Sequence, residues 1–188
     1  MPIDNAKDIV MLLLYASEDD RHRPGGITGR TRLQKLVYLA QLEGVLNCEE
    51  GMGFSFVPYK YGPFSKDLAL AVDFLISKGF ICEQLSDSET PIEDEDCAVD
   101  QEYLLPNDIE DTSCSYNEPS FQLSEKGINL AQTLYADLDN PEKERLSELR
   151  TRFGRLSLRQ LLKYVYTHYP EGAERSEIRH LILDNQQV

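Results

Sequence analysis

The distribution of charge divides this chain into an electrically neutral body and one acidic segment. Residues 79–125 contain fourteen aspartates or glutamates and no lysine or arginine, whereas the rest of the chain holds nineteen charges of each sign. The formal net charge of −14 therefore arises within that segment. Residues 86–118, its central part, have few apolar anchors, so we expect a mobile loop that repels phosphate and attracts basic surfaces.

Outside this segment, apolar residues recur at the spacing of amphipathic helices. The pattern predicts helices over residues 4–18, 32–43, 66–78 and 124–138, and three more from residue 140 onwards. Thr31 and Gln34 have the spacing of a capping box, which would satisfy the first backbone N–H groups of the second helix. Ser65 is placed to cap the third helix in the same way.

Short extended stretches separate some of these helices. Residues 54–59 alternate in polarity and precede a turn at residues 61–65, and strands are expected at residues 80–85 and 120–123. Three helices followed by a two-stranded hairpin is the element order of a winged helix. We therefore predict a mainly α chain with a small β-hairpin, of class α+β. A winged-helix-like domain would span residues 1–138, with the acidic segment at its wing tip, and a C-terminal helical extension would span residues 139–188.

Two neighbouring motifs resemble a known group of prokaryotic proteins. They are GRTRLQKLVYLA at residues 29–40 and FSFVPYKYGPFS at residues 54–65. Together they are similar to the YwgA-like family and to the SocA-type, or Panacea-domain, antitoxins. The resemblance covers roughly residues 5–82. It implies a winged-helix-like fold and a role in toxin neutralisation, protease-adaptor work or phage defence, with no catalytic motif.

A hydrophobic patch ringed by charge is what binding a folded partner requires. The turn and the third helix offer such a patch, because the helix face that would read DNA carries apolar side chains. We therefore predict a non-catalytic interaction module that binds a toxin, a nuclease or other defence protein, or a protease. The residues predicted to contact this partner are Tyr59, Lys60, Tyr61, Phe64, Leu70 and Phe74.

The alternative is a DNA-binding transcriptional regulator. Its phosphate contacts would be the bases around the second and third helices, namely Arg30, Arg32, Lys35, Lys60 and Lys66. We disfavour nucleic acid as a partner, because base readout needs polar side chains on the exposed face of the third helix. Arginines between residues 145 and 159 form a basic stripe, which we expect to pair mostly with nearby acids.

Other function classes lack a signal. None of the three histidines stands in a metal-binding spacing, the four cysteines form no CxxC pair, and no cofactor motif occurs. We therefore expect no enzyme, metal or cofactor, although an unrecognised enzyme would need only a pocket with converging titratable groups. No apolar run is long enough for a membrane span, and no signal sequence is evident. We expect a cytoplasmic protein and leave a homodimer open.

Overall fold

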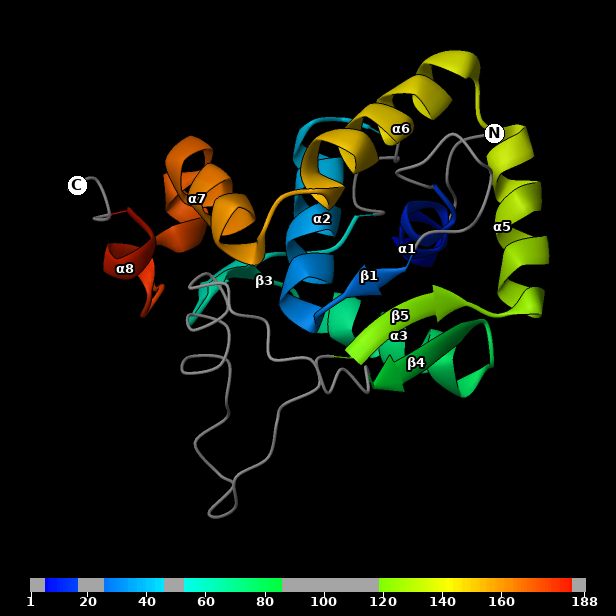
Figure 1. Ribbon diagram of the computed structural model, residues 1–188, viewed down its shortest axis with the longest axis horizontal. Helices are drawn as coiled ribbons and strands as arrows, with labels where there is room; N and C mark the ends of the chain where they lie inside the picture. Colours follow the sequence, from blue (N-terminus) through cyan, green and yellow to red (C-terminus); the bar gives the residue numbers. More distant parts are fainter. Residues whose placement is uncertain (1–5, 17–25, 46–52, 86–118, 184–188) are drawn as a thin grey trace, which may run out of the picture.

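Figure 1 shows the computed structural model, which describes residues 6–16, 26–45, 53–85 and 119–183. The predictions made for the acidic segment 86–118 lie outside the described residues. So do those that concern Cys48, Cys97, Cys114 and His22.

Helices dominate the described part of the chain. The elements in chain order are α1 (Ala6–Tyr15), β1 (Ile27–Thr28), α2 (Arg30–Leu42), β2 (Val57–Tyr59), β3 (Gly62–Phe64), α3 (Lys66–Ser77), β4 (Ile81–Leu85), β5 (Pro119–Leu123), α5 (Glu125–Asp137), α6 (Asn140–Gly154), α7 (Leu158–His168), the 3-10 turn η1 (Pro170–Ala173) and α8 (Arg179–Leu183).

The strands form two small antiparallel sheets. One has the order β1-β5-β4, and the other is the hairpin β2–β3. Leu85 at the end of β4 pairs with Pro119 at the start of β5. The two residues that flank residues 86–118 are therefore neighbours in the sheet. The predicted mainly helical α+β chain with a small hairpin is confirmed. The winged-helix assignment stays a prediction, although α1, α2, α3, β4 and β5 follow the expected order.

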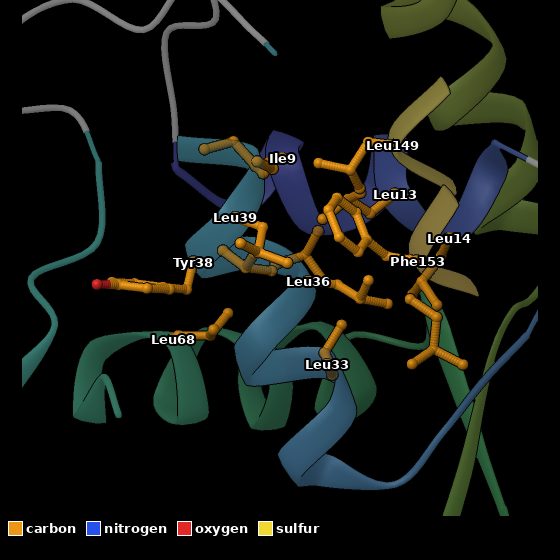
Figure 2. Close-up of a cluster of buried hydrophobic side chains, with 14 of the residues drawn as sticks. Ile9, Leu13, Leu14, Leu33, Leu36, Tyr38, Leu39, Leu68, Leu149 and Phe153 are labelled. Atoms are coloured by element: carbon orange, nitrogen blue, oxygen red, sulfur yellow. The ribbon is translucent and has the colours of Figure 1, made fainter. Parts of the chain in front are cut away.

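The core is one continuous cluster that extends from α1 to α8. All residues from 9 to 14 of α1 are buried, so this helix is enclosed on every side, as its all-round apolar sequence requires. Figure 2 shows side chains of α1, α2, α3 and α6 meeting at the centre, among them Ile9, Leu13, Leu36, Leu68, Leu149 and Phe153.

The C-terminal helices share this core with the N-terminal part. Arg150 of α6 is 1% exposed. Its Nε donates to the carbonyl of Ala16 at 3.0 Å, and its Nη2 donates to that of Gly26 at 3.4 Å. A buried guanidinium that satisfies two backbone carbonyls fixes α6 against the end of α1 and the start of β1.

Most predicted helix ends are found at the expected residues. Ser65 caps α3 through Leu68 N–H, as predicted, Ser124 caps α5, and Ser157 with Gln160 forms a capping box at the start of α7. The helix α6 begins at Asn140, as expected, and its cap Asp139 forms a capping box with Glu142.

The predicted capping box at the start of α2 is wrong. Gly29 occupies the cap position, with no side-chain hydrogen bond to the helix, and Gln34 turns away to another element. Among the described helices, none is both long and apolar enough to cross a membrane.

Candidate functional site

The hairpin β2–β3 is fixed to α7 by a glycine. Gly62 has φ of +85°, a conformation that other residues rarely adopt. A Cβ atom at this position would lie 2.6 Å from Cε1 of the Tyr166 ring. Backbone and ring can therefore approach only because residue 62 lacks a side chain. The sequence predicted a simple turn at residues 61–65, but the structure shows residues 62–64 as a strand paired with β2.

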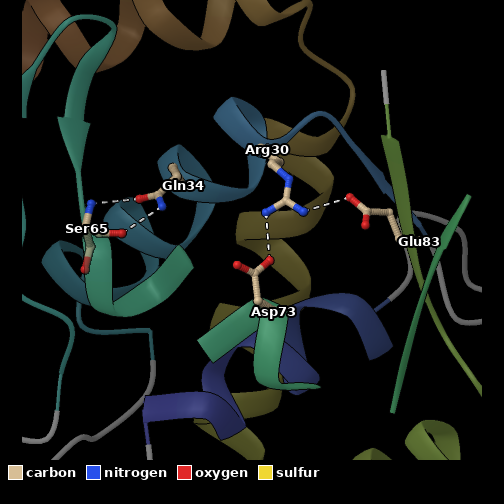
Figure 3. A network of polar contacts seen from close by, with 5 residues as sticks. All are labelled: Arg30, Gln34, Ser65, Asp73 and Glu83. Carbon is tan, nitrogen blue, oxygen red and sulfur yellow. Dashed lines mark hydrogen bonds and ion pairs between the residues drawn. The ribbon is translucent and has the colours of Figure 1, made fainter. Parts of the chain in front are cut away.

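A second contact joins the hairpin to α2. The side-chain amide of Gln34 donates to the carbonyl of Ser65 at 2.9 Å, and it accepts from the N–H of Ser65, also at 2.9 Å. Ser65 is completely buried, so its backbone groups need partners inside the protein. Figure 3 shows this pair of bonds between α2 and the start of α3. It sets the distance between the two helices and the hairpin.

A pocket of about 160 Å³ lies among α2, the hairpin and α3. The first half of α2 forms one wall, and the inward side of α3 forms another. The hairpin supplies aromatic side chains, so the lining is mostly apolar. Residues that define its character are Leu33, Lys35, Tyr59, Tyr61, Phe64 and Val72.

Lys35 is the buried cation of this pocket. Its side chain reaches the carbonyl of Pro63, which accepts a hydrogen bond from Nζ at 2.9 Å. The residue is only 2% exposed, and this desolvation lowers the pKa of Lys35 to about 7. Within the described part of the chain, no aspartate or glutamate lines the pocket.

Arg30 stands at the edge of the same pocket. Its guanidinium donates to Asp73 of α3 at 3.0 Å and to Glu83 of β4 at 2.9 Å. Figure 3 shows the arginine between these two acids, which come from different elements. Because all three side chains are partly exposed to solvent, each ion pair contributes little to stability by itself. Together they orient the guanidinium and offset its charge.

The structure brings together residues from both predicted sites. Tyr59, Tyr61 and Phe64 of the predicted protein-binding set line the pocket with Arg30 and Lys35 of the predicted nucleic-acid set. The rings of Tyr59 and Phe64 lie 5.2 Å apart and form the outer wall.

Other predicted partner-binding residues lie elsewhere. Leu70 and Phe74 are 57% and 45% exposed, on the solvent side of α3 and outside the pocket lining. Lys7 and Lys78 stand over the ring of Phe74, with their Nζ atoms 5.2 Å and 5.6 Å from its centroid. Lys60, also outside the lining, pairs with Glu177 at 3.8 Å.

The predicted cationic patch is not one surface. Lys35 is buried, and the Nη1 atom of Arg32 donates to the carbonyl of Leu156 at 2.6 Å, toward the junction of α6 and α7. Arg30 and Arg32 diverge because residues two apart lie on different sides of a helix. Lys66 is exposed at the first position of α3.

The basic stripe between residues 145 and 159 is also divided. Arg145 donates to the carbonyl of Val45, Arg152 to the hydroxyl of Tyr164 and Arg159 to the carbonyl of Leu181. Arg152 also forms an ion pair with Glu43 at 3.9 Å. The expected pairing of this stripe with nearby acids stays a prediction.

Sequence reasoning missed three contributors to the site. Gln34 was assigned to a helix cap, whereas it holds Ser65, and the Pro63 carbonyl and the exposed Val57 were not singled out. Long-range backbone contacts leave no spacing signal. A signal for Val57 did exist, because it stands two residues before Tyr59 in an alternating stretch.

The comparisons with known proteins add no name to this geometry. The chain matches no protein-family model, and no curated protein matches it in sequence. The similarity to the YwgA-like family and the Panacea-domain antitoxins therefore stays a prediction. Among the described residues, no group of three or more histidine, cysteine, aspartate or glutamate side chains is placed to hold a metal ion.

Proposed function

We propose that this protein is a non-catalytic interaction module that binds a protein partner through the hairpin β2–β3 and the mouth of the adjacent pocket. The observation that carries the proposal is the exposure of apolar side chains there. Val57 and Tyr59 are 53% and 49% exposed on one face of β2, beside the half-buried ring of Phe64. Exposed apolar groups next to a pocket are typical of the anchor positions of protein interfaces.

The resemblance of residues 29–65 to Panacea-domain antitoxins supports a partner of the kind that such antitoxins would bind. We propose an antitoxin, an adaptor or a phage-defence component, which acts in the cytoplasm on a toxin, a nuclease or a protease. The titratable groups that the described lining of the pocket offers are one amine, one guanidinium and two phenols, to which we assign a binding role.

A protein partner is favoured over DNA by the outward face of α3. Of the residues of α3 itself, this face presents Leu70, Asp73 and Phe74 at its centre and bases only at its two ends, Lys66 and Lys78. Lys7 of α1 is a further base, beside Phe74. Such a face offers no side chain for base readout and little attraction for phosphate. A DNA-binding regulator is therefore the second candidate. It would bind duplex DNA with an affinity that falls steeply as the salt concentration rises.

The test is a pair of matched surface variants. Val57→Asp/Tyr59→Asp places two charges on the hairpin, and Leu130→Asp changes an apolar residue of α5 that is 36% exposed. Figure 1 shows α5 on the opposite side of the molecule from the hairpin. A partner identified by affinity purification and mass spectrometry would be purified and titrated against each folded variant.

We expect the hairpin variant to lose at least tenfold in affinity and Leu130→Asp to bind like wild type. Equal binding by all three proteins would exclude the hairpin as the interface. Salt-dependent binding of duplex DNA, lost in Arg30→Gln or Lys66→Gln, would instead support the regulator.

A further inference from the structure

The pocket contains a buried cation that the described residues do not fully satisfy. Lys35 is 98% buried, and among the described residues its ammonium has one acceptor, the carbonyl of Pro63. A lysine ammonium has three N–H donors. A buried charge with donors to spare is costly, and an anion in the adjoining space would relieve that cost.

The surroundings of Lys35 favour an anion. The whole chain has a net charge of −14, yet the pocket lining contains Lys35 and, in the described residues, no acid. Arg30, at the pocket edge, is already paired with Asp73 and Glu83, so Lys35 is the cation that would meet an anion. The pocket wall also includes the start of α2, where Gly29 offers no side-chain cap. A helix N-terminus carries partial positive charge, so this end of α2 does not oppose an anion in the pocket.

The size of the pocket limits the rest of the ligand. Its volume is about 160 Å³. An engineered apolar cavity of ~150 Å³ in another protein accepts a benzene ring. The aromatic and aliphatic lining here, with Tyr59, Phe64 and Val72, therefore has room for an apolar group about the size of one aromatic ring.

We infer that the pocket holds a carboxylate joined to an apolar group, and that the carboxylate meets Nζ of Lys35. This inference rests on the proposed function, because we assign the carboxylate and the apolar group to the protein partner. One apolar side chain of the partner enters the pocket, and a carboxylate beside it reaches Lys35. This anchor would give the interface both its apolar contact and its charge specificity.

The other titratable groups in the lining are few. Arg30 comes from α2, and Tyr59 and Tyr61 come from the hairpin, while α3 contributes only apolar side chains. Burial, with help from Glu177 and Tyr59, raises the pKa of Tyr61, so this phenol stays neutral at pH 8. Carboxylate binding at that pH therefore requires proton uptake by Lys35, whose pKa is about 7 in the empty pocket.

The test uses the full chain and two small probes, 3-phenylpropionate and its neutral isostere 3-phenylpropionamide, titrated by NMR. At pH 6.5 we expect the acid to bind at least tenfold more tightly than the amide. Its affinity should fall by up to tenfold per pH unit above 7, whereas that of the amide should not change. Lys35→Met should remove the preference for the acid, and Lys60→Met, a lysine of the same hairpin outside the pocket, should retain it.

Several outcomes would overturn the inference. Equal binding of acid and amide, no binding of either, or a preference that survives in Lys35→Met would each do so. If Lys35→Met does not fold, Lys35→Gln and the pH dependence of the wild type decide instead. If 3-phenylpropionate binds to the pocket but does not displace the purified partner, the partner does not place a carboxylate there. Loss of partner binding in Val57→Asp/Tyr59→Asp without any acid preference would leave the proposed function standing and remove only this inference.

Discussion

Lys35 occupies a position where its own charge opposes folding. Its pKa is lowered from 10.5 to about 7 by burial, so the unfolded chain binds a proton that the folded chain releases between these values. The stability contributed by such a group is present above the unfolded pKa and lost as pH falls toward 7. A strongly perturbed pKa in a pocket is one mark of a candidate functional residue.

This cost predicts a pH dependence of stability. Between pH 7 and 9, the wild-type free energy of unfolding should rise by about 1.4 kcal/mol per pH unit more than that of Lys35→Met. Urea unfolding of both proteins at several pH values measures the difference. The comparison stays below pH 10 because of Tyr166, whose pKa is raised to about 12 by burial. Above pH 10 this phenol ionises more readily in the unfolded chain, so the free energy of unfolding declines for a reason unrelated to Lys35. Parallel stability curves for the two proteins would show that Lys35 keeps its charge.

Gly62 predicts a second effect of a single residue. Gly62→Ala should destabilise by ~2–4 kcal/mol, because the new methyl group meets the Tyr166 ring in a backbone conformation that is already unfavourable for alanine. Gly44 is the matched control: its φ is also positive, at 59°, but a Cβ there would meet nothing within 4 Å. Gly44→Ala should therefore cost only ~1 kcal/mol. Equal losses in thermal unfolding would mean that the hairpin does not lie against Tyr166.

At the scale of elements, α3 has two faces with different roles. Its inward face carries Leu68, Ala71, Val72 and Leu75, all of them buried. The outward face carries exposed apolar side chains beside a few charges. Periodicity alone predicted this division, because the four inward residues recur at helical spacing. Its neighbour, the hairpin, was harder to predict, because its position against α7 depends on a contact between Gly62 and Tyr166, about a hundred positions apart.

Substitutions on the two faces should differ in their effect. Leu70→Asp/Phe74→Asp should change the free energy of unfolding by less than about 1 kcal/mol, since both residues are surface-exposed and Lys7 and Lys78 stand near residue 74. Leu68→Asp should unfold the protein, because it buries a charge without a partner. Circular dichroism and urea titration would check both.

The outward pair also bears on partner binding. We expect Leu70→Asp/Phe74→Asp to lower the affinity for the partner less than Val57→Asp/Tyr59→Asp does, because Leu70 and Phe74 lie outside the pocket. If Leu70→Asp/Phe74→Asp abolishes partner binding and Val57→Asp/Tyr59→Asp has no effect, the interface lies on α3 and not on the hairpin.

At the scale of the whole molecule, one buried cluster includes residues on both sides of the predicted boundary near residue 138, and the boundary itself stays a prediction. Helices α6 and α7 contribute Leu149, Phe153 and Val165 to the same buried cluster as α1 and α2. A fragment of residues 1–138 would expose these contacts and leave the carbonyls of Ala16 and Gly26 without Arg150. We expect this fragment to lack a cooperative thermal transition. A sharp calorimetric transition near that of the full chain would show that the first part folds independently.

Much of the fold could be predicted from the sequence, but little of the site's geometry. Helix positions follow from local periodicity and capping residues such as Ser65 and Ser157, which act within a few positions. The pocket depends on long-range contacts, such as those of Gln34 with Ser65 and of Lys35 with Pro63, which no local pattern encodes. The sequence therefore identified Tyr59, Tyr61 and Phe64 as candidates, yet it placed Lys35 on the surface.

The most direct test of the account is hydrogen–deuterium exchange of the full chain with and without its purified partner. We predict slower exchange on binding over residues 57–64 of the hairpin and residues 30–35 of α2, with no change in α5. Protection confined to α5 or α6, with the hairpin unaffected, would contradict the claim that this protein binds its partner at the pocket.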